Sequence, residues 1–240
     1  MKSCNLCGWR GAEFAPRFRT EGRLVVCPDC QSLGRQRYLW LVLEQEGVLD
    51  GRPALLDVGP SPAISSRIAT RTRYVSIDVQ AFTPAVIRMN LTRLEFPDDY
   101  FHVVLCSHVL EHIKDDGVAL GEMYRTLRPG GRLFLQVPHK RNLAVGTEEW
   151  EQPDGHGHWR MYGAHDLRRR LEAIGFEVEI GNVREDHPEL ELDRMQMFAC
   201  RKPASDDAPE WDYSLLDWMA ERRAADAPDP KAFVHKPIST

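Results

Sequence analysis

One short stretch, LLDVGPSPA at residues 55–63, constrains the fold of this 240-residue chain most strongly. An apolar run meets a turn of small residues, and a helical pattern begins near Ala63. The order predicts a strand, a tight turn and a helix, which points backbone N–H groups at the polar part of a nucleotide-like ligand. Only Gly59 remains of the three glycines in a G-x-G-x-x-G fingerprint, so an ordinary turn without a ligand is an equal alternative here.

Composition excludes several classes of protein. The chain is 42% hydrophobic and 28% charged, which is ordinary for a globular protein. Its net charge of −5 argues against nucleic-acid binding driven by overall charge. The first forty residues nevertheless contain seven basic and three acidic residues, so a local basic patch that binds phosphates or an acidic partner is an alternative. No apolar run approaches ~20 residues, and no apolar segment follows Lys2. We expect a cytoplasmic protein without membrane contact.

Four of the six cysteines form two C-x2-C pairs separated by 19 residues: Cys4, Cys7, Cys27 and Cys30. This spacing is typical of a tetrahedral zinc site. Two disulfides are the alternative, but nothing marks the chain as secreted, and the cytosol keeps thiols reduced. We therefore predict a zinc ribbon over residues 1–31, folded by a structural zinc ion. Cys106 and Cys200 stand alone in apolar runs and are expected to pack in the core.

The rest of the chain divides into three parts. Residues 32–50 have helical spacing and would connect the ribbon to a main domain at 51–202. That domain alternates predicted strands with predicted helices, and "PGG" at 129–131 should stop its second helix. The predicted strands are 54–58, 73–79, 86–89, 102–107, 132–138, 176–183 and 195–200, and the predicted helices are 63–71, 115–128 and 164–174. Such alternation implies an α/β fold with a parallel sheet covered on both faces. Residues 203–240 are acidic and rich in proline, and we expect them to form a tail with a short docking helix.

The ordered motifs over about 50–200 resemble those of class I S-adenosylmethionine-dependent methyltransferases of the small-molecule type. They are the turn at 55–63, "VSID" at 75–78, "NLTRLEF" at 90–96, "FHVVLCSHVLEH" at 101–112 and "LRPGG" at 127–131. The resemblance implies a Rossmann-like seven-stranded sheet and S-adenosylmethionine as cofactor. It places the cofactor against Asp57, Gly59, Pro60, Ser61, Asp78, Val79, Asn90, Leu91 and Ser107.

Two of these positions have a direct chemical rationale. Asp78 lies 19 residues beyond Gly59, where a carboxylate at a strand end can accept hydrogen bonds from both ribose hydroxyls. Asn90 stands where the family generally has Asp, and its amide oxygen can still accept from the adenine amino group. Pro60 has no N–H to donate, and Ser61 and Ala63 replace family glycines, so the loop departs from the family pattern.

Histidines follow the strands that would surround the reacting methyl group. Methyl transfer to a hydroxyl needs positioning and a base or metal, and the candidate bases are His108, His139 and His158. Packed or solvent-facing histidines are the plain alternative. The string His108-x2-Glu111-His112 resembles the Glu-x2-Glu-His metal signature of ubiquinone-biosynthesis O-methyltransferases, which makes these three residues an alternative second metal site. The same string occurs in inverzincin peptidases, but the surrounding motifs argue against a peptidase.

We therefore expect methyl transfer from S-adenosylmethionine to a small polar metabolite or natural-product intermediate, at oxygen. An RNA or protein methyltransferase that uses the ribbon to grip its substrate is the first alternative. A non-catalytic module that binds the cofactor or a partner is the second. The sequence leaves the oligomeric state open, with a homodimer among the options.

Overall fold

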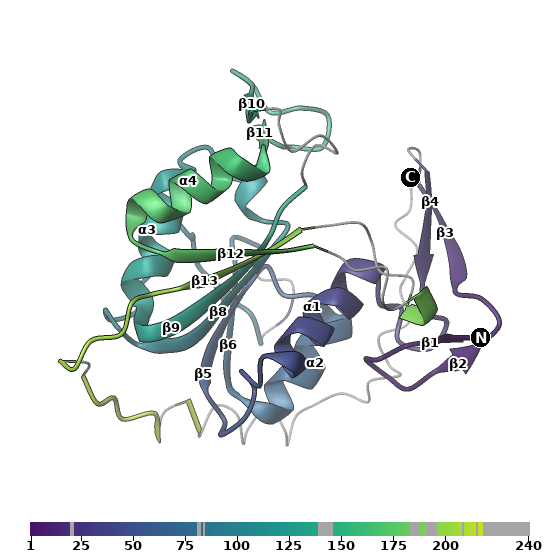
Figure 1. Cartoon of the computed structure of the whole chain (residues 1–240), viewed down its shortest axis with the longest axis horizontal. Helices are drawn as coiled ribbons and strands as arrows, with labels where there is room; N and C mark the ends of the chain where they lie inside the picture. The colour runs from purple at the N-terminus through teal and green to yellow at the C-terminus, as the bar shows by residue number, and fades with distance from the viewer. Residues whose placement is uncertain are drawn as a thin grey trace.

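A computed structural model describes residues 1–19, 22–80, 83, 85–138, 146–182, 188–190, 196–207, 209–214 and 216–217. Its centre is a seven-stranded sheet in the order β12-β13-β9-β8-β5-β6-β7 (Figure 1). The strands are β5 Ala54–Val58, β6 Arg73–Asp78, β7 Ile87–Arg88, β8 Phe101–Ser107, β9 Leu127–Gln136, β12 Glu177–Asn182 and β13 Gln196–Arg201. The predicted Rossmann-like sheet is confirmed. It is mixed rather than wholly parallel, because β13 runs antiparallel to both β9 and β12.

Helices cover both faces of the sheet, as the unbroken apolar strands predict. The helices α1 Gly34–Gln45 and α2 Pro62–Arg71 lie on one face, and α3 Asp116–Thr126 and α4 Ala164–Ile174 lie on the other (Figure 1). Side chains of β5 alternate between the two cores: Leu56 and Val58 pack in the cluster that includes α3 and α4, and Leu55 packs in the cluster with α1 and α2. Every residue of β5 is buried for this reason.

The strand order reverses next to β5, and this reversal positions the site. From β5 the chain proceeds to β6 and β7 on one side, and then returns to β8 and β9 on the other. The loops that leave β5 and β8 therefore diverge at the carboxyl edge of the sheet. In open α/β sheets a ligand crevice forms at such a switch point.

The boundary between α3 and β9 differs from the prediction. The helix ends at Thr126 and β9 begins at Leu127, so the segment 129–131 belongs to the strand and does not end the helix. Lys202 explains the early stop, because its Nζ donates to the carbonyls of Tyr124 and Leu127 at 3.0 and 2.8 Å. A cation satisfies carbonyl groups at a helix end that lack intrahelical partners. The Gly130 amide then donates to the Lys202 carbonyl at 2.9 Å, which continues the sheet pairing.

The N-terminal residues form two small hairpins beside α1 and α2 (Figure 1). Strands β1 Lys2–Ser3 and β2 Arg10–Gly11 pair antiparallel, as do β3 Ala15–Arg19 and β4 Gly22–Val26. The Asn5 side-chain amide donates to the Arg37 carbonyl at 2.9 Å, and Arg67 of α2 donates to the Leu6 carbonyl. These contacts attach the hairpins to both helices on this face.

Two further segments pack onto the body. A hairpin of β10 Glu148–Glu149 and β11 Arg160–Met161 lies near the 3-10 turn η1 Leu110–His112. Apart from these, a second 3-10 turn, η2, spans Pro188–Leu190. Near the C-terminus the Trp211 indole donates to the Asp99 carbonyl at 3.0 Å and the Tyr213 hydroxyl to the Tyr100 carbonyl at 2.7 Å. Within the described residues, no helix is both long and apolar enough to cross a bilayer.

Candidate functional site

A pocket of about 570 Å³ opens at the carboxyl edge of the sheet, beside the point where the strand order reverses. Its walls come from the ends of β5 and β6, the segment after β7 and the segment after β8. The lining residues are Val58, Gly59, Ile77, Asp78, Val79, Gln80, Met89, Asn90, Leu91, Thr92, His108, Val109, His112, Ile113, Lys114 and Asp115. Five of the predicted cofactor residues, from Gly59 to Leu91, thus meet around one pocket.

The backbone conformation beside this pocket requires a glycine at position 59. Its φ of +67° is a left-handed conformation, and its amide donates to the Ile77 carbonyl at 2.9 Å. A Cβ at this position would lie 2.5 Å from Cγ2 of Val109, which is too close for any side chain. Only glycine lets the turn after β5 adopt this conformation while the segment after β8 approaches it.

Asp78 and Asn90 present polar groups to the pocket from adjacent strand ends. Oδ1 of Asp78 accepts from the Gln80 amide at 2.7 Å, an Asx turn that holds the carboxylate at the end of β6. Oδ1 of Asn90 accepts from the Thr92 amide and hydroxyl, both at 3.0 Å. The sequence suggested that this oxygen would accept from a ligand, but Thr92 already uses it. The other polar group of this side chain, the amide nitrogen, can donate hydrogen bonds but cannot accept them.

The other predicted cofactor residues do not line the pocket. Asp57 is buried beneath the loop, where burial raises its carboxyl pKa and where it accepts from Tyr74 at 2.6 Å and Ser65 at 2.7 Å. Ser61 accepts from Gln36 of α1, and the Ser107 hydroxyl donates to Gln136 at 2.9 Å. Pro60 is likewise not among the lining residues. The side chains of Asp57, Ser61 and Ser107 thus bond to protein groups outside the pocket lining.

His108 lines the pocket directly after β8. Its φ of +57° is unusual for a residue with a side chain, and its amide donates to the Gln136 carbonyl at 2.8 Å. Its Nδ1 lies 3.3 Å from Oε1 of Glu111, an ion-pair distance without hydrogen-bond geometry. Among the described residues, the buried Nε2 of His108 has no hydrogen-bond partner. Of the other two predicted bases, His139 lies outside the described residues and His158 lies beside His112.

The structure brings His158 to His112, 46 residues away in sequence, and this contact was not predicted. Their ring centroids are 4.9 Å apart, and Glu111 completes a group whose ligand atoms lie within 4.8 Å of one another. The buried Arg160 causes the contact, because its guanidinium donates to the carbonyls of Ile113 and Lys114, both at 2.6 Å. The His-x-Arg string at 158–160 is visible in the sequence, but its spacing alone gives no indication of a contact with His112.

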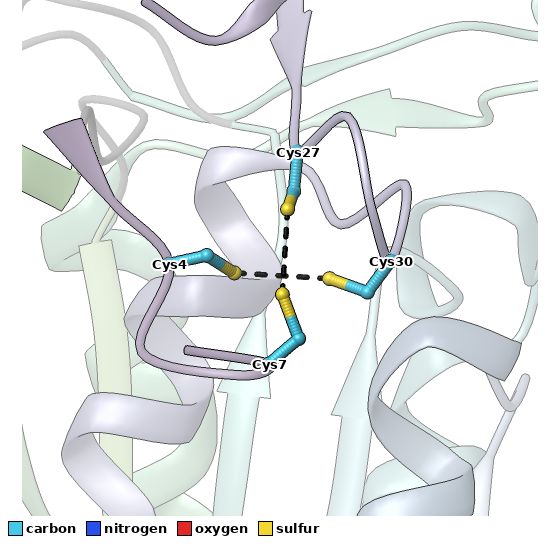
Figure 2. Close-up of side chains that lie close together, drawn as sticks. All are labelled: Cys4, Cys7, Cys27 and Cys30. Carbon is cyan, nitrogen blue, oxygen red and sulfur yellow. Dashed lines mark hydrogen bonds between the residues drawn. The ribbon is translucent and has the colours of Figure 1, made fainter. Parts of the chain in front are cut away.

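The four paired cysteines converge from two knuckles, with their sulfur atoms directed at a common centre (Figure 2). The Sγ atoms of Cys4 and Cys30 are 3.7 Å apart, and those of Cys7 and Cys27 are 3.5 Å apart. Four sulfurs about 2.3 Å from a tetrahedral zinc ion would lie about 3.8 Å from one another, so the arrangement fits zinc. All four are free thiols, as are the buried Cys106 and Cys200. The hydrogen bond from Cys30 lowers the pKa of Cys4 to about 4.

The strand order, the turn at Gly59 and the carboxylate of Asp78 at the end of β6 together define a class I S-adenosylmethionine-dependent methyltransferase fold. A family model described as "Methyltransferase domain" matches residues 32–179. The chain belongs to this family.

Among curated proteins, a "probable S-adenosylmethionine-dependent methyltransferase" of Mycolicibacterium smegmatis is 30% identical over 158 residues, which cover 66% of this chain and 52% of that protein. The chain thus spans about half the length of this relative. The ubiquinone/menaquinone biosynthesis C-methyltransferase UbiE of Vibrio campbellii is 45% identical over 49 residues, or 20% of this chain and 19% of that protein.

Solved structures share the fold at low sequence identity. The [4+2]-cyclase SpnF has a TM-score of 0.56 at 21% identity, over 71% of this chain and 81% of that one. The 1,6-didemethyltoxoflavin-N1-methyltransferase of Burkholderia thailandensis, solved with bound 1,6-didemethyltoxoflavin and S-adenosylhomocysteine, has a TM-score of 0.52 at 15% identity, over 78% of this chain and 99% of that one. These likenesses concern the fold alone.

Proposed function

We propose that this chain transfers the methyl group of S-adenosylmethionine to an oxygen atom of a small polar acceptor. The observation that carries the proposal is the shared pocket of Gly59, Asp78 and Asn90 at the reversal of strand order. Bound there, S-adenosylmethionine supplies an electrophilic methyl group. The Asp78 carboxylate would accept from the ribose hydroxyls, and the glycine turn would give the methionine end close access to the backbone.

The pocket volume of about 570 Å³ lies in the range of small-molecule sites. The net charge of −5 also favours a small acceptor over RNA. Turnover of a small acceptor should therefore be nearly independent of salt, whereas RNA binding would weaken steeply as salt rises. Because the four thiols can bind zinc only when reduced, we further propose a cytoplasmic location.

We propose His108 as the general base among the predicted histidines. Its Nδ1 lies 3.3 Å from Oε1 of Glu111, without hydrogen-bond geometry, and its Nε2 has no hydrogen-bond partner among the described residues. In the tautomer that carries its proton on Nδ1, Nε2 would hold a lone pair that could take the proton of an acceptor hydroxyl bound in the pocket.

We propose that Cys4, Cys7, Cys27 and Cys30 hold one structural zinc ion. All four coordination positions would be filled by protein sulfur, which leaves none for catalysis. The ion would stabilise the two hairpins, which are too small to form a core of their own.

Calorimetric titration with S-adenosylmethionine tests the cofactor site. Asp78→Asn should lower the affinity about 10- to 100-fold, because it weakens two hydrogen bonds from the ribose. Asp207→Asn, in the exposed C-terminal segment, is the matched control and should leave the affinity unchanged. Equal affinities in the two variants would refute the assignment of the pocket.

An assay of S-adenosylhomocysteine release tests the base. His108→Gln should lower kcat about 10²- to 10⁴-fold while the affinity for S-adenosylmethionine stays within a few fold. His139→Ala and His158→Ala belong in the same series. Full turnover in His108→Gln would assign the proton transfer to another group.

A further inference from the structure

A buried carboxylate beside the pocket lacks the partners that such a group requires. Glu111 is 1% exposed, and within the described residues neither of its oxygens has a hydrogen-bond partner. The basic groups recorded near it there are Nδ1 of His108 at 3.3 Å and Nε2 of His112 at 4.0 Å. Lys114 points to the Trp159 ring instead, at 4.9 Å. A buried carboxylate without a compensating partner is costly, so a cation bound at this position would stabilise it.

Two histidines beside Glu111 are arranged as metal ligands. Nδ1 of His112 lies 3.1 Å from the Gly157 carbonyl oxygen, and Nδ1 of His158 lies 3.1 Å from Oδ2 of Asp154. Both oxygens can only accept, so each Nδ1 carries a hydrogen and each Nε2 is left with a lone pair. Metal-binding histidines almost always donate their second N–H to such an oxygen, which fixes the tautomer and the ring orientation.

The backbone holds the three residues together from two distant segments. The Trp159 amide donates to the Glu111 carbonyl at 2.8 Å. This bond joins the residue after His158 to the residue before His112. Arg160 adds its two hydrogen bonds to the segment that follows η1. The ligand atoms lie within 4.8 Å of one another, and ligands of one zinc ion at about 2.1 Å lie about 3 to 4 Å apart, so small side-chain rotations suffice.

We infer that Glu111, His112 and His158 form a second metal site, one that binds a divalent transition-metal ion such as Zn²⁺. Two imidazoles and one carboxylate match the donor set of open zinc sites, which keep a position for water or substrate. The set differs from the one suggested by sequence spacing, because His158 takes the place of His108. His112 also lines the pocket, so the open position can face an acceptor there. That last role rests on the proposed function, whereas metal binding itself does not.

Equilibrium dialysis against Zn²⁺, followed by elemental analysis, tests the site. The native chain should bind one zinc ion more than His158→Ala or Glu111→Gln, whatever the cysteines bind. Asp154→Asn removes the carboxylate that orients His158 and should weaken this ion about 10- to 100-fold. His165→Ala, at an exposed position on α4, should match the native chain.

Thermal unfolding provides a second readout and a check on folding. Added Zn²⁺ should raise the Tm of the native chain and of His165→Ala by more than that of His158→Ala, because the ion binds only the folded state. Calorimetric titration of the same variants with S-adenosylmethionine measures whether the cofactor site is intact. A lost metal site can therefore be distinguished from a failed cofactor site. Equal zinc content in the native chain and His158→Ala would overturn the inference.

Discussion

At the scale of single residues, backbone conformation and close contacts decide which positions tolerate change. Gly59 combines a left-handed φ with the approach of Val109, so two separate penalties oppose any side chain. Gly121, in the middle of α3, has neither constraint, because a Cβ there would meet nothing within 4 Å. Substitution of Gly121 therefore serves as the control for substitution of Gly59.

Gly59→Ala should destabilise the protein by about 2–4 kcal/mol, the sum of left-handed strain and the clash with Val109. Gly121→Ala should instead stabilise it by about 0.5–1 kcal/mol, because alanine favours the helix. Urea unfolding measures both changes. S-adenosylmethionine affinity should fall only in Gly59→Ala, and an unperturbed Gly59→Ala variant would show that the turn is free to adopt another conformation.

At the scale of elements, the N-terminal hairpins support α2, the helix that begins after the turn at Gly59. Arg67 of α2 binds the Leu6 carbonyl, and Ser61 at the start of α2 accepts from Gln36 of α1. Cys4 and Cys27 belong to the same hydrophobic cluster as Leu39 and Ile64 of these helices. A change at the cysteines can therefore reach the pocket through α1 and α2, but only indirectly.

Cys4→Ser should lose one zinc ion relative to the native chain, and amide hydrogen exchange should accelerate over residues 1–31 first. S-adenosylmethionine binding should persist at an affinity a few fold lower. Cys200→Ala is the control, since this buried cysteine does not belong to the group of four N-terminal cysteines and its loss should leave the zinc content unchanged. Loss of cofactor binding while the hairpins stay protected would contradict this division of roles.

At the scale of the whole molecule, stability depends on pH through a histidine within the sheet. Burial, followed by the charges of Arg128 and Arg73, lowers the pKa of His102 to about 4. Its Nδ1 faces the Ala54 amide at 3.2 Å and its Nε2 faces Arg128 at 2.8 Å. Both neighbours are donors, so they oppose the doubly protonated ring, whose two nitrogens can only donate. Because the unfolded chain binds the proton near pH 6.5, the stability present above that pH is lost as pH falls toward 4.

His102→Gln should remove this pH dependence. The native chain should lose about 1–2 kcal/mol between pH 6.5 and pH 4 through this group, a figure reduced for partial exposure to solvent. Urea unfolding at several pH values measures the loss, with His165→Gln on exposed α4 as the control. Identical pH profiles for the native chain and His102→Gln would show that other groups govern acid stability.

Much of the fold was predictable because its signals are local. The strand at 54–58 was predicted with its observed bounds, and helix 164–174 likewise, because apolar periodicity and flanking turn residues mark both. The start of β9 was not, because the side chain that ends α3 belongs to Lys202, far along the chain. The side-chain partners of Asp57, which are Tyr74 and Ser65, were not predicted, because local periodicity does not indicate contacts 17 and 8 residues along the chain.

The sequence by itself indicated the family, the succession of strands and helices along the chain and the two C-x2-C pairs, since each is marked by a local motif or spacing. Only the tertiary structure decided which histidines meet. His108, Glu111 and His112 are close in the chain, yet the partner that joins Glu111 and His112 is His158. The physical reason is the buried Arg160, whose hydrogen bonds draw the later segment onto the turn after β8. Such long-range pairing has no signature in local periodicity.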